Sequence, residues 1–207
     1  MSMYRPPAFA SDDRAAIHAV IRQRVFGTLA AVVDGTVAFA YAPVVLDAAR
    51  NAVRFHLARA NPLAALADGT ELTLSFVGPD AYVSPDWYET RGRVPTWNYV
   101  AVEGRGRARR LEGTALRQLL VDVSAAEETK LLPKAPWTID KVPADKLAGL
   151  LNAIVGFEVT FETLEGKFKL SQNVPAGDVA RVIDGLVARG DPASMAVAHA
   201  MRPARLP

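Results

Sequence analysis

The sequence predicts a mainly β protein of the α+β class, in which helices pack outside a small barrel. At least five short apolar segments have the alternation and turn-sized spacing of antiparallel strands. Asp34-Gly35 is a two-residue hairpin signal. Helical patterns do not alternate regularly with the strands, so a parallel nucleotide-binding sheet is not predicted.

The first elements are predicted to be a helix and a hairpin. Ser11 is expected to cap the helix, which stops before Gly27. Residues 28–33 and 36–46 form strands that pair around Asp34-Gly35. The chain of 207 residues, 50% of them hydrophobic, is expected to form one domain over residues 1–207, with residues 174–207 as a helical appendage.

The middle of the chain combines strands with an aromatic segment. Asn61-Pro62 has the form of a helix N-cap followed by proline. An irregular aromatic region is expected from Gly78-Pro79 to Tyr99, and strict alternation predicts a strand from Val100 onward. The other predicted elements are strands at 53–58, 71–77 and 157–162, and helices at 116–123, 147–154, 177–189 and 192–201.

Composition narrows the function. The chain contains no cysteine, which excludes disulfides, thiolate metal sites and cysteine nucleophiles. Its apolar runs are too short for a membrane helix and it opens without a secretory signal, so a cytoplasmic location and no membrane partner are expected. The net charge is +2, with arginines concentrated on one strand at positions 105, 107, 109 and 110. These arginines suit either a solvated strand face or contact with nucleic acid or phosphate.

Three segments carry groups that could bind a ligand. The loop from Ala58 to Asn61 joins a guanidinium and an amide to a helix start, which suits an anion. Residues 94–99 combine Trp97 with hydrogen-bonding side chains that suit a planar ring. Residues 167–173 bring two lysines, a hydroxyl and two amides after the last strand, where the lysines could reach one phosphate. Each segment also has a purely structural interpretation.

Taken in order, several segments resemble the PaiB-type family of FMN-binding negative transcriptional regulators. The matching segments are MYRPPAF (3–9), FGTL (26–29), FHLARANP (55–62), GPDAYVSP (78–85), WY (87–88), VPTWNY (94–99), VGFE (155–158) and EGKFKLSQN (165–173). They span nearly the whole chain. The ordered set is more specific than any single motif.

The resemblance implies an FMN-binding split β-barrel that pairs into a homodimer, with FMN as cofactor. It places the FMN phosphate and ribityl chain near His56, Ala58, Arg59 and Asn61, and the flavin near Ser84, Thr96, Trp97 and Asn98. Lys169 and Gln172 would close the site. One departure is the stretch from Phe39 to Pro43, where relatives often carry a Thr-His pair that faces the flavin.

Two functions compete at this stage. The resemblance favours a regulator that acts through DNA or a regulatory protein partner, although no helix-turn-helix signature is present. The alternative is a flavin-dependent oxidoreductase acting on a small molecule, with His56 and Tyr41 as nearby polar groups. A haem protein with His56 as axial ligand and a scaffold that binds no cofactor also remain open.

Overall fold

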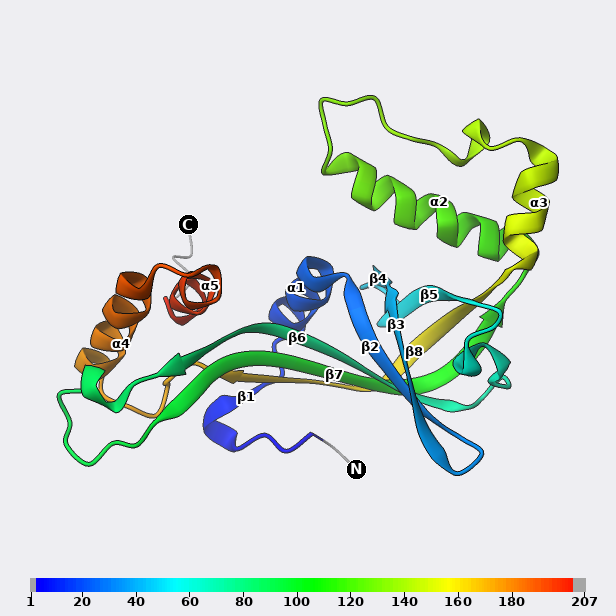
Figure 1. Ribbon diagram of the computed structural model, residues 1–207. Helices are drawn as coiled ribbons and strands as arrows, with labels where there is room; N and C mark the ends of the chain where they lie inside the picture. The colour runs from blue at the N-terminus through cyan, green and yellow to red at the C-terminus, as the bar shows by residue number, and fades with distance from the viewer. Residues whose placement is uncertain (1–2, 203–207) are drawn as a thin grey trace. The chain divides into compact units, whose positions relative to one another are not determined.

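The computed structural model describes residues 3–202, which form eight β-strands, five α-helices and four short 3-10 helices (Figure 1). The strands are β1 (Ala10–Ser11), β2 (Phe26–Val33), β3 (Thr36–Pro43), β4 (Val45–Asp47), β5 (Ala52–Ala58), β6 (Glu71–Val83), β7 (Thr96–Leu111) and β8 (Ile154–Lys169). The helices are α1 (Arg14–Arg24), α2 (Gly113–Thr129), α3 (Ala144–Asn152), α4 (Ala176–Arg189) and α5 (Pro192–Met201).

The strands form one sheet in the order β3-β2-β6-β7-β8-β5-β4, with β1 paired to β8. The pairs β1–β8, β2–β3, β2–β6, β4–β5 and β5–β8 are antiparallel. The predicted α+β fold class is therefore confirmed. Within residues 3–202, the helices lack the combination of length and apolar character needed to cross a bilayer.

The chain divides into two compact units, each built from separate stretches. Unit 1 comprises Met1–Ile17, Val77–Val102 and Glu165–Pro207, and unit 2 comprises His18–Phe76 and Glu103–Leu164. The long strands β6, β7 and β8 each contribute residues to both.

Unit 2 begins with the predicted hairpin. Asp34 and Gly35 both have positive φ, 48° and 76°, which suits the two-residue turn that joins right-twisted strands. β2 and β3 then pair residue by residue from Val33–Thr36 to Phe26–Pro43. Alternate side chains enter the core, where Leu29 is fully buried.

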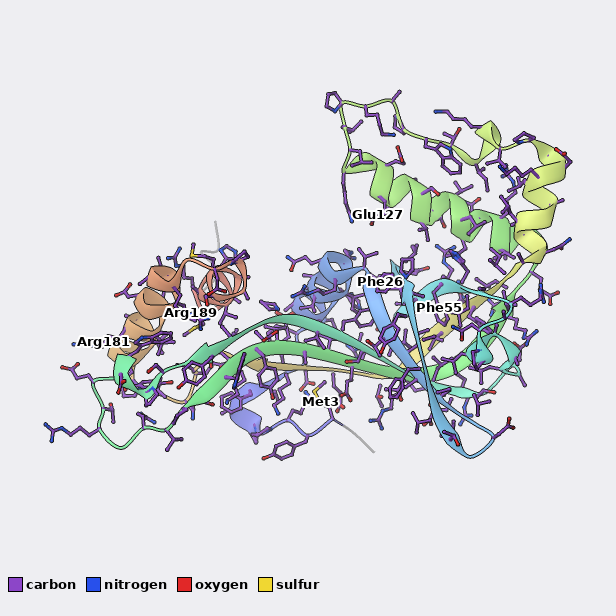
Figure 2. The ribbon with its side chains drawn as sticks, viewed as in Figure 1. Met3, Phe26, Phe55, Glu127, Arg181 and Arg189 are labelled. Carbon is purple, nitrogen blue, oxygen red and sulfur yellow. The ribbon has the colours of Figure 1, made fainter. Side chains whose placement is uncertain are left out.

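The centre of unit 2 is aromatic and continuous with its sheet. Phe55 of β5, labelled in Figure 2, stacks on Phe157 of β8 with ring centroids 5.6 Å apart. Their Cα atoms are partners in the β5–β8 ladder, so this is a cross-strand pair that fixes the register. A second cluster of Leu111, Leu116 and Leu119 packs helix α2 next to the sheet.

Unit 1 is built around helices α4 and α5. A core of seven buried residues joins both helices to β6: Ala81, Val83, Val182, Leu186, Val197, Ala198 and Met201. Gly190, with φ of 70°, ends α4, and the side chain of Asp191 caps α5 by accepting from the Ser194 amide at 3.0 Å. The predicted pair of C-terminal helices and the break between them are confirmed.

The N-terminal segment of unit 1 is tied to β8. The Met3 amide donates to Glu165 at 2.8 Å, and Arg5 forms ion pairs with Asp12 at 2.7 Å and Glu165 at 3.2 Å. The Lys167 ammonium lies over the rings of Tyr4 and Tyr99, at 4.9 and 5.4 Å from their centroids.

Helix α1 begins later than predicted. Ser11 belongs to β1, and Asp13 caps the helix by accepting from the amides of Ala15 and Ala16. The predicted helix at 147–154 ends at Asn152, because Ile154 is already the first residue of β8. Ser11 and Asp13 both have the short polar side chain of a helix cap, and Asp13 is the one that lies at the right distance from the first turn.

The strand boundaries also differ from those predicted. The segment 36–46 splits at Val44 into β3 and β4. β6 continues through Gly78-Pro79 to Val83, and β7 begins at Thr96, so much of the expected irregular region is strand. Gly and Pro usually interrupt strands, but here the adjacent residues bury alternate side chains and keep the strand pattern.

Candidate functional site

The predicted site residues fall into two groups, one in each unit. His56, Ala58, Arg59 and Asn61 belong to unit 2, whereas the predicted residues from Ser84 to Gln172 belong to unit 1. Each group has its own surroundings.

His56 lies within β5, with Gly156 as its Cα partner on β8. Its Nδ1 atom is buried and has no hydrogen-bond partner among the described residues. Burial lowers the pKa of His56 below its ordinary value, so the imidazole is neutral at pH 7. A buried, neutral nitrogen without a partner is suited to a polar group brought by a ligand.

Arg59 holds the chain where α3 ends. Its Nε donates to the carbonyl of Asn152 at 2.7 Å, and its Nη2 donates to that of Ile154 at 3.1 Å. Asn61 caps the short helix η2 (Pro62–Ala65) by accepting from the Leu63 amide at 2.9 Å, as its Asn-Pro signature predicts. The Asn61 amide closes the loop by donating to the Ala58 carbonyl at 2.8 Å.

The arginine-rich strand has intramolecular partners. Arg109 pairs with Glu158 at 2.7 Å and Arg107 with Glu162 at 3.3 Å, while Arg105 lies 3.8 Å from Glu103. Arg110 donates to the backbone carbonyls of Ala64 and Leu66, in the segment between β5 and β6. These contacts favour the interpretation of a solvated, ion-paired face over a nucleic-acid surface.

In unit 1 the structure brings Thr96, Asn98 and Lys169 together around a cavity of about 240 Å³. Thr96 and Asn98 come from the start of β7, and Lys169 ends β8. The Lys169 ammonium donates to Thr96 Oγ1 at 2.5 Å. Within residues 3–202 it has no carboxylate partner, so its charge is available to a ligand.

Asn98 is 1% exposed and its amide is engaged within unit 1. Its Nδ2 donates to Ser171 Oγ at 2.9 Å and lies 3.3 Å from the sulfur of Met201. The Ser171 hydroxyl in turn contacts Asn98 Oδ1 at 3.2 Å. Asn98 therefore joins the ends of β7 and β8 to helix α5.

Trp97 lies on the opposite face of β7 from Thr96 and Asn98. Successive residues of a strand point to opposite faces, and burial along β7 alternates accordingly. Trp97 is 52% exposed and meets the ring of Tyr82 edge-on, with centroids 6.1 Å apart. The 94–99 cluster, predicted to act as one aromatic and hydrogen-bonding group, is thus divided between two faces because its second half is strand.

Ser84 and Gln172 are engaged locally. Ser84 caps the short helix η3 (Pro85–Trp87), accepting from the Asp86 amide at 3.3 Å. Gln172 accepts from the Leu170 amide at 2.7 Å and donates to the Phe168 carbonyl, so it closes the turn around Ser171, whose φ is 66°. These contacts shape the chain on either side of the cavity.

The predicted site residues did not include the other polar residues of this cavity, although Asn173 lies in the 167–173 segment that was singled out from the sequence. Arg93, Tyr88 and Asn173 also line it, together with apolar side chains. Arg93 and Tyr88 come from the loop after η3, far from Lys169 in the sequence. No motif marks them, although Tyr88 lies within the WY segment of the resemblance.

The residues present fit FMN. In unit 2, the loop that carries Arg59 has the cationic and amide donors that a phosphate requires. In unit 1, the half-exposed rings of Trp97 and Tyr82 and the polar side chains of Thr96 and Lys169 are of the kinds that a flavin ring requires as walls and edge contacts. Among the described residues, no group of three or more His, Cys, Asp or Glu side chains is arranged to hold a metal ion.

Comparison with known sequences places the chain in a family. The family described as "Putative FMN-binding domain" matches residues 3–163. Protease synthase and sporulation protein PAI 2 of Bacillus subtilis (strain 168) is 30% identical over 202 residues, which cover 96% of each chain. An uncharacterized protein of Emericella nidulans, AN0679, is 30% identical over 242 residues, covering 97% of this chain and 96% of its own.

Comparison with solved structures agrees on the fold. The conserved hypothetical protein Rv2991 from Mycobacterium tuberculosis has a TM-score of 0.59 at 16% identity, covering 84% of this chain and 94% of its own. The FAD and haem binding protein from Mycobacterium smegmatis has a TM-score of 0.58 at 17% identity, covering 88% and 80%. The split-barrel prediction is confirmed, and the family match confirms FMN as the cofactor. The chain therefore belongs to the FMN-binding family that its motifs resemble, with the PaiB-type protein of B. subtilis among its relatives.

Proposed function

We propose that this chain is a cytoplasmic, homodimeric FMN-binding regulator of the PaiB type. The match of the FMN-binding family over residues 3–163 carries the proposal. The name of the B. subtilis relative, which refers to protease synthesis and sporulation, supports a regulatory role. Neither finding favours the alternative of a flavin-dependent oxidoreductase.

The proposed FMN contacts fall into the same two groups of residues, and each group is proposed to hold a different part of the cofactor. His56, Ala58, Arg59 and Asn61 would hold the phosphate and ribityl chain. Residues from the other group would hold the flavin and close the site: Ser84, Thr96, Trp97, Asn98, Lys169 and Gln172. When bound, FMN supplies a ring that exchanges electrons, and the residues of this chain orient it.

The proposed dimer uses the outer face of the β2–β3 hairpin. Alternate residues on this face are apolar and exposed, among them Val32 (63%), Phe39 (58%) and Tyr41 (64%). Ala30 pairs with Phe39 and Thr28 with Tyr41, so these side chains form one continuous surface. A second copy of the chain can cover it about a twofold axis, since the same patch meets itself.

The regulatory partner is proposed to be DNA or another regulatory protein. Arg107 and Arg109 of β7 are ion-paired within the chain, which makes this strand a poor DNA surface and favours a protein partner. We further propose that residues 1–207 act as one domain, with 174–207 as its helical appendage.

The test is the visible spectrum of the purified chain before and after FMN addition and desalting. We expect a retained flavin spectrum at about one equivalent per chain. The double variant Lys169→Met with Arg59→Met should lose most of it, whereas Arg91→Met, in the exposed loop, should retain it. A wild-type chain that retains no flavin would contradict the proposal.

A further inference from the structure

The cavity of unit 1 is lined in part by residues outside the proposed FMN set, among them Arg93. Four segments enclose it: residue 9 of the N-terminal segment, the loop 88–94, the start of β7, and residues 169–174. All of them belong to unit 1. The cavity is therefore a property of this compact unit by itself.

The cavity is cationic. Lys169 and Arg93 both line it, and none of the described residues that line it is acidic. The Lys169 ammonium contacts a neutral hydroxyl, that of Thr96. A lysine whose contact is a neutral hydroxyl, in a lining with a second cation and no acidic side chain, favours an anion as occupant.

Arg93 is held in place by Tyr88, which also lines the cavity, and by Asp178, which does not. Its guanidinium lies 5.5 Å from the centroid of the Tyr88 ring and 3.8 Å from Asp178 of α4. Asp178 also accepts from the amides of Glu89 and Thr90, at 2.8 and 3.3 Å, and so ties the loop to the helix. Arg93 Nε is buried and has no hydrogen-bond partner among the described residues. A fixed guanidinium with an unused donor is prepared for an acceptor atom from a ligand.

The wall also has an apolar and aromatic part. Phe9, Val94 and Val174 join Tyr88 around the cavity, while Asn98 and Ser171 satisfy one another. At about 240 Å³, the space lies just below the usual range for small-molecule sites and suits a compact ligand. An anionic head with a short apolar body matches both parts of the lining.

We infer that this cavity binds a small organic carboxylate in addition to FMN, with Lys169 and Arg93 holding the carboxylate and Tyr88 and Phe9 contacting the body. The inference rests on the proposed function only in sharing Thr96, Asn98 and Lys169 with the proposed FMN set. Thr96 and Trp97 point to opposite faces of β7, so a ligand in this cavity and a ring beside Trp97 would contact different faces of the strand. A regulator that senses a metabolite requires a site of this kind.

The experiment is calorimetric titration of the FMN-loaded chain with benzoate, and with benzamide as its neutral isostere. Benzoate should bind saturably, with benzamide at least about tenfold weaker, because a hydrogen bond to a charged group is typically worth that factor. Arg93→Met, at a residue outside the proposed FMN set, should weaken benzoate binding about tenfold. Arg93→Lys should recover part of the loss, which excludes misfolding, and Arg91→Met should have no effect.

FMN retention is read from the absorption spectrum of the same samples, so the two proposals can fail separately. Benzoate binding by a chain that retains no flavin supports the cavity while contradicting the cofactor proposal. Absent benzoate binding, equal binding of benzamide, or insensitivity to Arg93→Met would overturn the inference. Displacement of FMN by benzoate would also overturn it, since the cavity would then be part of the flavin site.

Discussion

Arg109 and Glu158 form an ion pair in which one partner is buried and the other is exposed. Arg109 Nη2 lies 2.7 Å from Glu158 Oε1, yet the glutamate side chain is 5% exposed and the arginine 57%. Arg50 adds two contacts of 3.1 Å, one to each carboxylate oxygen. Two surface arginines from different strand ends thus converge on one buried carboxylate of β8.

We expect Glu158→Gln to lower the free energy of unfolding by about 2 kcal/mol, because charge-assisted hydrogen bonds are lost while both arginines can turn to solvent. Glu162→Gln, which breaks the exposed pair with Arg107, should cost less than about 0.5 kcal/mol. Urea denaturation of both variants checks the difference. Equal effects would mean that burial of Glu158 adds nothing.

The same carboxylate makes stability sensitive to acid. Burial alone would raise the pKa of Glu158, but the hydrogen bonds and charges of Arg109 and Arg50 outweigh it, and the pKa falls below 4.5. The stabilisation is therefore complete above pH 4.5 and is lost as the pH falls through the lowered value. In Glu158→Gln, the loss of stability below pH 4.5 should be smaller than in the wild type.

Gly106→Ala should be strongly destabilising. A Cβ at this position would lie 2.0 Å from the carbonyl oxygen of Thr160, a backbone atom that can move only with β8. We expect a loss of at least about 3 kcal/mol, or failure to fold. Gly149→Ala in α3 meets nothing within 4 Å and should stabilise by about 0.5–1 kcal/mol through helix propensity. Chemical denaturation separates the two, and a tolerated Gly106→Ala would refute the close approach.

His56 should give the chain a second pH dependence, in a different range. Burial lowers the pKa of His56 in the folded chain below 6.5. At a pH between the folded and unfolded pKa values, the unfolded chain therefore binds a proton that the folded chain does not. Stability should fall as the pH drops below about 6.5, with a slope of at most about 1.4 kcal/mol per pH unit. His56→Gln should flatten the curve between pH 7 and 5, and an unchanged slope in denaturation curves would contradict the prediction.

Phe39→Lys should convert the proposed dimer into a monomer. The twofold axis would bring both new charges into the same apolar interface. Desolvating even one charge costs more than about 1.4 kcal/mol, so the dissociation constant should rise at least tenfold. Leu132→Lys, at a 61% exposed position after α2, is the control and should leave the dimer intact. Sedimentation velocity measures both, and a Phe39→Lys variant that stays dimeric would place the interface elsewhere.

Local chemistry made much of the fold predictable. The Asp34-Gly35 turn, the Asn61-Pro62 cap and the break at Gly190 each depend on side-chain or backbone properties of neighbouring residues. The small residues that alternate along β7 are typical of close packing, and Phe161 and Thr160 of β8 approach closely at Gly104 and Gly106. The length of β6 was not predicted, because Gly and Pro usually interrupt a strand, whereas β6 keeps its alternating burial through Gly78-Pro79.

The candidate site was predictable only in part. Motif order identified the family and its cofactor, and Thr96 and Lys169 do meet, although 73 residues separate them. Successive residues of a strand point to opposite faces, so Trp97 faces away from Thr96 although both belong to one motif. The prediction of an irregular segment at 94–99 was wrong, and it concealed this division. Arg93 lines the cavity and pairs with Asp178. This ion pair joins a loop to a helix, and no local pattern in the sequence predicts it.

The interleaving of the two units limits how this protein can be divided. The backbone passes from one unit to the other after residues 17, 76, 102 and 164, so no single cut separates them. A protease that nicks the loop near residue 92 would leave two fragments, each holding part of both cores. Such fragments would remain associated under native conditions and separate only in denaturant, and neither unit could be inherited or transplanted as a continuous gene segment.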